Sequence, residues 1–570
     1  MPARRATFVG IARLLARCYP WPVETVDDAD LRRALAYLDA EVDAETTVRA
    51  GRGTATLVAV SGLLAVVVAP GRLRLPVAVA VLALALGVVH AARRGPIAVA
   101  TARRTAALGA APALVARAVL RMRVEPASER AAAFAARGQG RLAADLSEHV
   151  RQAAGTPRSG LAAFGAAWAD WNPPLRRAAL LVESAADAPA GERGATLDRA
   201  MEAMLDGTRD RMAAFAEQVR GPTTALYAFG VLLPLALVAV LPAARVAGLP
   251  LSIPVLVVLY DLLLPAMLVG AGAWLLVRRP AAFPPPEVSR DHPDVPDRRW
   301  PTAAVGAGAG LVAVVATGPF PAWTRWPAVV GAVVGSALVV RFRPVKRVRD
   351  DARAVEANLT DALYLVGRRV SDGAAVESAI EEAAPEVAGR TGEMLAEAAG
   401  VQRRLRVSVC EAFLGDYGAL ADVPSPQARS VAALLAIVAR EGRPAGRAVV
   451  SMADHVDDLQ RVEREARREP ASVTGTLRNT AGVFGPLVGG ATVALADGMA
   501  AGTLGEPLPT AALGLAVGGY VLLLAAILPA LATGLERGFD RALVGYRVGL
   551  ALLSAVGAFF AGFVGAGFAA

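Results

Sequence analysis

Residues 227–242 read YAFGVLLPLALVAVLP, an apolar stretch that directly follows the charged run LDRAMEAMLDGTRDRMAAFAEQVRG at 197–221. The same change recurs 252 residues later, where DDLQRVEREARREP at 457–470 precedes TAGVFGPLVGGATVAL at 480–495. Across that shift Asp206 matches Asp458, Arg209 matches Arg461, Gly230 matches Gly482 and Pro234 matches Pro486. The recurrence indicates an internal repeat, with a charged part and an apolar part in each copy.

The composition indicates a membrane protein. Of the 570 residues, 55% are hydrophobic, and the mean hydropathy of +0.44 is high for a soluble protein of this length. The net charge is +9, carried almost wholly by arginine, because Lys346 is the only lysine. The sequence has neither zinc-finger spacing nor an aromatic RNA-binding motif, so we expect no nucleic acid partner. Cys18 and Cys410 lie far apart, which argues against a disulfide framework or a metal site.

Nine stretches are apolar and long enough to be transmembrane helices, which need roughly 20 residues each. They lie at 54–70, 75–92, 226–244, 253–277, 302–319, 326–342, 479–499, 509–533 and 548–568. The predicted order is an N-terminal segment (1–53), four transmembrane hairpins (54–92, 226–277, 302–342 and 479–533) and a last transmembrane helix (548–568). Polar segments at 93–222 and 343–476 and a proline-rich linker at 278–301 separate the hairpins.

The positions of the arginines predict the orientation. Clusters at 93–94, 278–279 and 341–343 lie at span ends, and such clusters mark the cytoplasmic side of a membrane. We therefore expect a multi-pass protein of the cytoplasmic membrane with its N-terminus, both long polar segments and the linker in the cytoplasm. Arg72 and Arg74 lie on the opposite side, which makes the first hairpin the least well supported.

Both polar segments are predicted to be helical domains. Apolar residues follow helical spacing in each, and no segment alternates with the period of a strand. The expected fold is all-α, with two cytoplasmic helical domains in a parallel repeat, because each half begins on the same side of the membrane. The apolar stripes comprise Leu197, Met201, Met204, Met212, Phe215 and Val219 in the first half, and Val449, Met452, Val456, Leu459 and Ala466 in the second.

Gly230 with Pro234, and Gly482 with Pro486, lie inside the span that follows each charged run. A proline removes one backbone hydrogen bond and clashes with the preceding turn, so a kink or hinge is expected at both places. The alternative is that these residues carry no function, since membrane helices tolerate glycine and proline.

The sequence lacks the motifs of the common hydrolases. It has no glycine-rich loop ending in Gly-Lys-Ser/Thr and no His-Glu-x-x-His, so we expect no enzyme activity, catalytic residue, cofactor or metal. Asp261 is an intramembrane polar residue, which is either functional or a partner in one interhelical hydrogen bond. An intramembrane aspartyl protease would need a second aspartate at the same depth, and the other candidate, Asp497, lies near the outer end of its span.

The duplicated polar segments, each followed by Gly-Val-x-x-Pro-Leu at 230–235 and 482–487, resemble the type II secretion system F domain family. These are the membrane platform proteins of type IV pili, Tad pili and archaella, and the duplicated form is similar to the archaeal members. The helix starts GTPRSGLAAF at 155–164 and SDGAAVESAI at 371–380 are also similar to the family. Asn-Pro-Pro at 172–174 departs from it, with no such break expected in the second half.

The resemblance implies a non-enzymatic platform that couples a hexameric secretion ATPase to the insertion or extraction of pilin-like subunits, and a homo-oligomer. A multi-pass secondary transporter with parallel repeats is the alternative. Arginines before the kinked spans are candidate ATPase contacts, although they could equally anchor the protein at the membrane or form a solvated helix face paired with Asp206 and Asp458. The candidates are Arg209, Arg211, Arg461, Arg464, Arg467 and Arg468.

Overall fold

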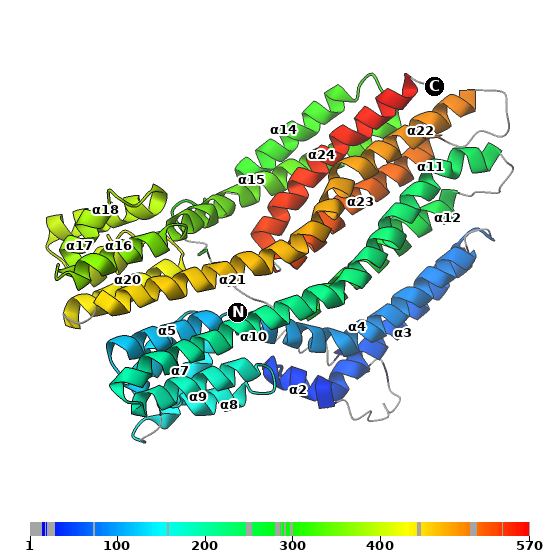
Figure 1. Cartoon of the computed structure of the whole chain (residues 1–570). Helices are drawn as coiled ribbons and strands as arrows, with labels where there is room; N and C mark the ends of the chain where they lie inside the picture. Colours follow the sequence, from blue (N-terminus) through cyan, green and yellow to red (C-terminus); the bar gives the residue numbers. More distant parts are fainter. Residues whose placement is uncertain are drawn as a thin grey trace.

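The computed structural model describes residues 14–17, 19, 29–71, 74–156, 159–246, 253–279, 286, 288–289, 292–296, 300–441, 446–501, 510–538 and 540–568. Within these ranges every regular element is a helix, which confirms the all-α prediction. The molecule is elongated, with long apolar helices at one end and two groups of shorter helices at the other (Figure 1).

The first half of the chain begins with α2 (Ala29–Tyr37), α3 (Ala44–Val68) and α4 (Arg74–Leu108). The first helical group, α5 to α10, follows, and α10 leads into an apolar hairpin. The bounds are α5 (Ala111–Val124), α6 (Ser128–Ala136), α7 (Arg141–Ala153), α8 (Leu161–Ala167), α9 (Pro173–Asp187), α10 (Ala190–Tyr227), the π-turn η2 (Ala228–Leu232), α11 (Leu233–Val246), α12 (Ile253–Val257), the π-turn η3 (Val258–Leu263) and α13 (Leu264–Arg278).

The second half has a similar order, and its second helical group comprises α16 to α21. One further helix, α24, ends the described chain. The bounds are α14 (Trp300–Ala316), the short 3-10 turn η4 (Ala322–Thr324), α15 (Arg325–Glu356), α16 (Leu359–Ser371), α17 (Val376–Ala383), α18 (Gly389–Leu405), α19 (Val409–Leu414), α20 (Pro426–Glu441), α21 (Gly446–Asn479), the π-turn η5 (Thr480–Phe484), α22 (Gly485–Ala501), α23 (Thr510–Arg537) and α24 (Arg541–Gly567).

Eight helices in the described ranges, some joined end to end with a neighbour, are long and apolar enough to cross a membrane. The ninth predicted span, 302–319, corresponds to α14, which is apolar but only 17 residues long and packs along α15. The eight are Ala44–Val68, Val77–Val124, Ala190–Leu241, Ile253–Arg278, Ala322–Ser371, Thr474–Gly498, Thr510–Arg537 and Arg541–Gly567.

The helices do not stop where the apolar stretches stop. The predicted boundaries at 92, 222, 342 and 476 all fall inside continuous helices, namely α4, α10, α15 and α21. Arginine, glutamate and alanine have high helix propensities, so a change from apolar to charged side chains does not interrupt the backbone hydrogen bonds. Each of these helices therefore joins a helical group to an apolar segment without a loop.

Most residues of the predicted apolar stripes lie in the cores of the two helical groups, whereas Phe215 and Val219 pack in the apolar bundle. Met204 and Leu197 are fully buried in the first group, and Val449 and Met452 are buried in the second. Val219 and Leu459 are only partly buried, and the side chain of Ala466 lies outside the described set.

The two groups also contact each other. Leu120 and Phe134 of the first group pack in the hydrophobic core of the second, and Val462 of α21 packs in the core of the first. The end of the molecule that carries the two groups is therefore held together by apolar contacts between the groups as well as within each one.

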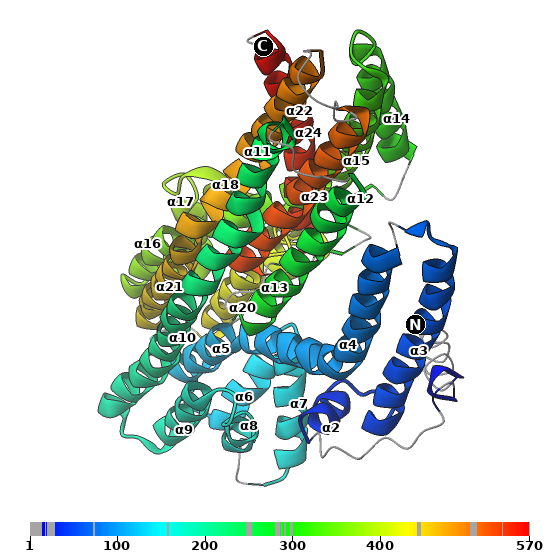
Figure 2. The same cartoon turned by 90° about the vertical axis from the view of Figure 1, so that its right-hand side faces the viewer.

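Helices recur at a nearly constant offset. Helix α5 begins at Ala111 and α16 at Leu359, a shift of 248 residues, and the starts of α6 and α17, α7 and α18, and α8 and α19 differ by the same number. The π-turns η2 and η5 begin 252 residues apart. The hairpin α3–α4 differs from α14–α15: it stands to one side of the apolar bundle, whereas α15 packs along α24 (Figures 1 and 2).

The Asn-Pro-Pro break of the first half has a counterpart, so the expected difference is wrong. Helix α9 begins at Pro173, and the Oδ1 atom of Asn172 accepts a hydrogen bond from the backbone N–H of Leu175 at 3.2 Å. Helix α20 begins at Pro426, and the Oγ atom of Ser425 accepts one from Ala428 at 2.9 Å. Serine and asparagine are equivalent as N-caps, and proline suits the first helical position. Two different sequences therefore form the same kind of helix start.

The glycine-led turns at 155–164 and 371–380 both precede helices. Gly160 and Gly373 have φ values of +80° and +105°, a backbone conformation that favours glycine. They open α8 and α17, however, which are the fourth helix of the first group and the second helix of the second group. The two motifs therefore do not occupy corresponding places in the two halves.

Candidate functional site

The two changes from charged to apolar sequence coincide with the π-turns η2 and η5. Gly230 lies in η2 and Pro234 follows it, while Gly482 lies in η5 and Pro486 follows that turn. Because proline has no N–H, the carbonyl four residues earlier, which belongs to the glycine in each case, loses its α-helical donor. A π-turn absorbs such a defect by widening the helix locally.

Two buried tyrosines donate hydrogen bonds to the first irregular segment. The hydroxyl of Tyr260 donates to the carbonyl of Pro234 at 3.1 Å, and that of Tyr520 makes a longer contact of 3.5 Å with the carbonyl of Gly230. The two rings meet edge to face, with centroids 5.2 Å apart. Tyr520 of α23 thus supplies a donor to the carbonyl that loses one through Pro234, and Tyr260 of η3 adds a second hydrogen bond to the same irregular segment.

The two irregular segments are also linked directly. The hydroxyls of Tyr227, which precedes η2, and of Thr480, the first residue of η5, lie 3.0 Å apart. Further along, Arg209 of α10 lies 3.5 Å from the carboxylate of Glu465 on α21. Helices α10 and α21 therefore lie side by side, with polar contacts at two levels (Figure 1).

Two predicted contact arginines on α10 already have partners within the protein. Arg209 pairs with Asp206 at 3.1 Å, as its spacing predicts, and with Glu465. Arg211 is half-buried and donates to the Oδ1 atom of Asn172 at 2.7 Å. Arg211 therefore faces its own helical group.

The arginines on α21 are more exposed. Arg461 and Arg464 both pair with Asp457, at 3.2 and 3.6 Å, and the side chain of each is more than half exposed. The observed pair is thus with Asp457 and not with Asp458 as predicted, because a spacing of four residues also aligns side chains on a helix. Arg468 is exposed, and the side chain of Arg467 lies outside the described set.

Asp261 lies in η3, four residues before Pro265, and borders an apolar cavity of about 870 Å³. Its Oδ1 atom is buried and has no hydrogen-bond partner among the residues that the structure describes. Gly519 faces this carboxyl, and a Cβ atom there would lie 3.3 Å from Oδ1. Asp497 lies exposed on α22, away from this cavity. The other lining residues are Trp323, Trp326, Pro327, Val330, Val334, Leu515, Leu522, Leu523, Ala526 and Leu552.

A buried polar cluster at the end of α23 joins three helices, and sequence reasoning missed it. Glu536 accepts hydrogen bonds from Thr474 of α21 at 2.5 Å and from Arg547 of α24 at 2.7 Å, and Arg478 lies 3.2 Å away. Buried Arg279 donates to the carbonyls of Leu535 at 2.7 Å and Glu536 at 3.0 Å, which are terminal acceptors of α23. One signal in the sequence could have indicated this cluster, namely a lone glutamate at the end of an apolar span. A glutamate buried there requires cationic partners.

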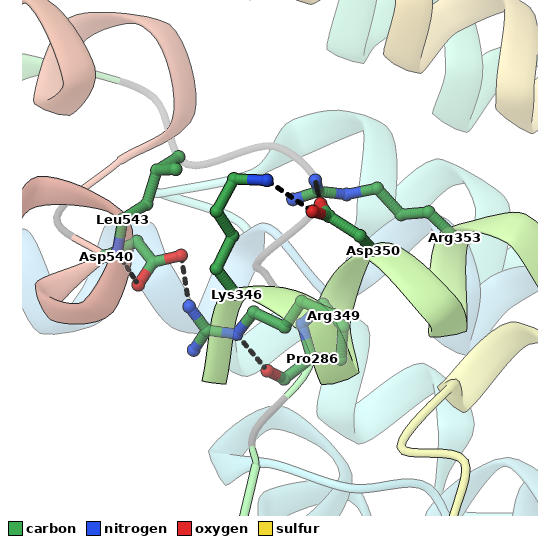
Figure 3. A network of polar contacts seen from close by, with 7 residues as sticks. All are labelled: Pro286, Lys346, Arg349, Asp350, Arg353, Asp540 and Leu543. Carbon is green, nitrogen blue, oxygen red and sulfur yellow. Dashed lines mark hydrogen bonds and ion pairs between the residues drawn. The ribbon is translucent and has the colours of Figure 1, made fainter. Parts of the chain in front are cut away.

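A second polar network joins α15 to α24 (Figure 3). The carboxylate of Asp540 caps α24 by accepting hydrogen bonds from Ala542 and Leu543, at 2.9 and 3.2 Å, and also forms an ion pair with Arg349. Arg349 donates in turn to the carbonyl of Pro286 in the linker at 3.1 Å. Lys346 pairs with Asp350 within α15, so it is Arg349 that ties the basic end of the α15 span to α24 and the linker.

The described part of the chain brings no three histidine, cysteine or acidic side chains together as a metal site would require. The arrangement consists of long continuous helices, irregular turns at two matching positions and polar contacts between helix ends. No protein-family model, curated protein or solved structure matches this chain.

Proposed function

We propose that the chain is a membrane platform protein of a type IV pilus-like assembly machine, which couples a hexameric secretion ATPase to the movement of pilin-like subunits. One observation carries the proposal. Helices α10 and α21 each run without a loop from a helical group to a π-turn and on into an apolar segment, and they contact each other at Tyr227 and Thr480. A displacement of either helical group can therefore reach the apolar bundle through continuous backbone.

The recurrence of helices at offsets of 248 to 256 residues supports a parallel duplication. We place both helical groups on the cytoplasmic side, where arginines at the span ends favour them. On this reading α14, which packs along α15, is the ninth span. A soluble ATPase could then reach both groups from one compartment.

Arg461, Arg464 and Arg468 on α21 are the best-placed candidate contacts for the ATPase, since their side chains are exposed. Charged patches steer association and set specificity more than they add affinity. Any conformational change requires that the ATPase contact two states of the platform differently, which nucleotide hydrolysis in the ATPase can supply.

The test is co-purification of the full-length protein with a secretion ATPase from the same organism. The double variant Arg461→Glu with Arg464→Glu should reduce ATPase retention. The matched control is Arg151→Glu on α7, which also reverses the charge of an exposed arginine, since the side chain of Arg151 is 72% exposed. Failure of the wild-type protein to retain any cognate ATPase, together with normal surface filaments after deletion of the gene, would remove the proposal.

A secondary transporter is the second candidate, and Asp261 supports it. A carboxyl group with an unpartnered oxygen beside a membrane-level cavity is a feature that ion-coupled transporters use. Asp261→Asn should abolish solute uptake and leave filaments intact if the protein is a transporter. The platform proposal expects no uptake activity in either form.

A further inference from the structure

A cavity of about 170 Å³ lies where the first helical group meets the apolar bundle. Its wall combines the end of α4 and start of α5, the turn before α9, one side of α10, and Arg278, the last residue of the membrane-spanning α13. Since a water molecule occupies about 30 Å³ of liquid, this space would hold several waters or one small polar group. Its position beside Arg278 puts it at the level of a membrane surface.

Three arginines line the cavity, namely Arg104, Arg211 and Arg278, and no carboxylate is among its described lining residues. Arg104 stacks on Trp171, with 4.3 Å from the guanidinium carbon to the ring centroid, and Arg278 stacks on Trp274 at 4.0 Å. Contact with a ring face helps to hold each guanidinium in place, and Arg104 has further N–H groups besides the one that it donates to the carbonyl of Arg33 at 3.3 Å. Planar donors of this kind suit a phosphate group, which accepts from two directions at once.

Asn172 provides independent evidence that the cavity holds a hydrogen-bond acceptor in the functional protein. Its side chain is 1% exposed, and its Oδ1 atom already accepts from Leu175 and Arg211, which fixes the orientation of the amide. The Nδ2 group is therefore the donor side, and it has no partner among the described residues. A buried donor without an acceptor is costly, so this one is expected to have a partner that the protein does not itself supply.

The backbone adds to the same preference. Helix α5 begins at Ala111, beside lining residues Gly109 and Pro112, and has no side-chain cap at its N-terminus. The positive end of the helix dipole favours an anion there.

We propose that this cavity binds a phosphate group, and that the headgroup of an anionic phospholipid is its source. Arg278 and Trp274 lie at the end of a membrane span, where such headgroups lie, and exposed tryptophans are common at that level. The site would anchor the first helical group to the lipid surface. The proposal does not depend on the protein's being a filament platform.

Native mass spectrometry of the full-length protein, titrated with phosphatidylglycerol, phosphatidylcholine or inorganic phosphate, tests it. Wild type should retain one phosphatidylglycerol per chain in preference to phosphatidylcholine. Arg278→Gln should weaken that binding by roughly tenfold, since a charge-assisted hydrogen bond to phosphate is among the stronger ones. Arg278 is exposed, so the variant should fold normally. Arg220→Gln, an exposed arginine near the apolar end of α10, is the control.

Asn172→Asp provides a second variant, because aspartate keeps the cap of α9 and the bond to Arg211 but replaces the free donor with a negative charge. It should weaken phosphatidylglycerol binding further. Variant-sensitive binding of inorganic phosphate without any preference among lipids would support the site and assign it a soluble ligand. If wild type, Arg278→Gln and Asn172→Asp all retain phosphatidylglycerol equally well, and all retain inorganic phosphate equally well, the proposal is overturned.

Discussion

Replacement of Asp540 should separate two stabilising contributions that meet at one carboxylate. Its Oδ1 atom caps α24 through two backbone N–H groups, and its Oδ2 atom pairs with Arg349 on α15 (Figure 3). Asp540 is 5% exposed and the side chain of Arg349 is 15% exposed, so water does little to screen the pair.

The magnitudes follow from these contacts. Loss of an N-cap costs about 1 kcal/mol, and loss of one partner from a buried ion pair costs about 3–5 kcal/mol. The lower end applies here, because Arg349 keeps its hydrogen bond to the carbonyl of Pro286. Asp540→Ala should therefore lower the free energy of unfolding by about 4 kcal/mol. Asp540→Asn, which can still cap α24, should lower it by about 3 kcal/mol.

Guanidinium unfolding of the full-length protein in a mild detergent, followed by helical circular dichroism, measures both values. Combining Asp540→Asn with Arg349→Met completes a double-mutant cycle, which should give a coupling energy of at least ~1 kcal/mol. Asp43→Ala is the control, because Asp43 precedes α3 without making a side-chain cap. A loss below ~1 kcal/mol for Asp540→Asn would refute the argument that burial makes this ion pair matter.

Three further outcomes are expected. Tyr520→Phe should lower the free energy of thermal unfolding by about 1 kcal/mol. In a Pro234→Leu background it should lower it by nothing, because the backbone N–H of the leucine then donates to the Gly230 carbonyl in place of the hydroxyl. Equal losses in the two backgrounds would contradict the role of Tyr520 as a replacement donor. Gly562→Ala places a Cβ atom 2.1 Å from the backbone oxygen of a neighbouring helix and should cost about 1–3 kcal/mol, unlike Gly565→Ala, which meets nothing within 4 Å. Burial raises the pKa of Tyr37 above 10.0, although neighbouring arginines act to lower it. Because the unfolded chain then loses this proton at a lower pH than the folded protein does, the contribution of Tyr37 to stability is present below pH 10 and is lost as the pH rises further. Unfolding curves measured between about pH 9 and pH 11 should show that Tyr37→Phe removes this loss of stability. If the variant keeps the same pH dependence as wild type, another group causes the loss.

Much of the fold could be predicted from local patterns. The stripe containing Met201 and Met204 identifies the buried face of α10, because helical spacing is a property of neighbouring residues. The ends of the spans could not be located in the same way. Hydropathy changes at 222, yet α10 continues to Tyr227 and the π-turn, because helix formation depends on backbone hydrogen bonds that charged side chains do not interrupt.

The site was less predictable, because its partners are distant in sequence. The Gly-x-x-x-Pro repeat coincides with the two π-turns, but the hydroxyl that contacts Gly230 comes from Tyr520, 290 residues away. Arg211 reads as one more surface charge, whereas folding places it against Asn172, 39 residues earlier. A single sequence contains no signal for either contact.

The continuous course of α10 gives it the geometry of a lever arm. Its 38 residues extend over about 57 Å at 1.5 Å per residue, and it ends at the π-turn. A rotation of only ~5° at that pivot would sweep the opposite tip through ~5 Å, about one helical turn. If α10 moves as one rigid body about that turn, small angular changes among the apolar helices would be magnified at the far end, and a force applied there would be multiplied at the pivot.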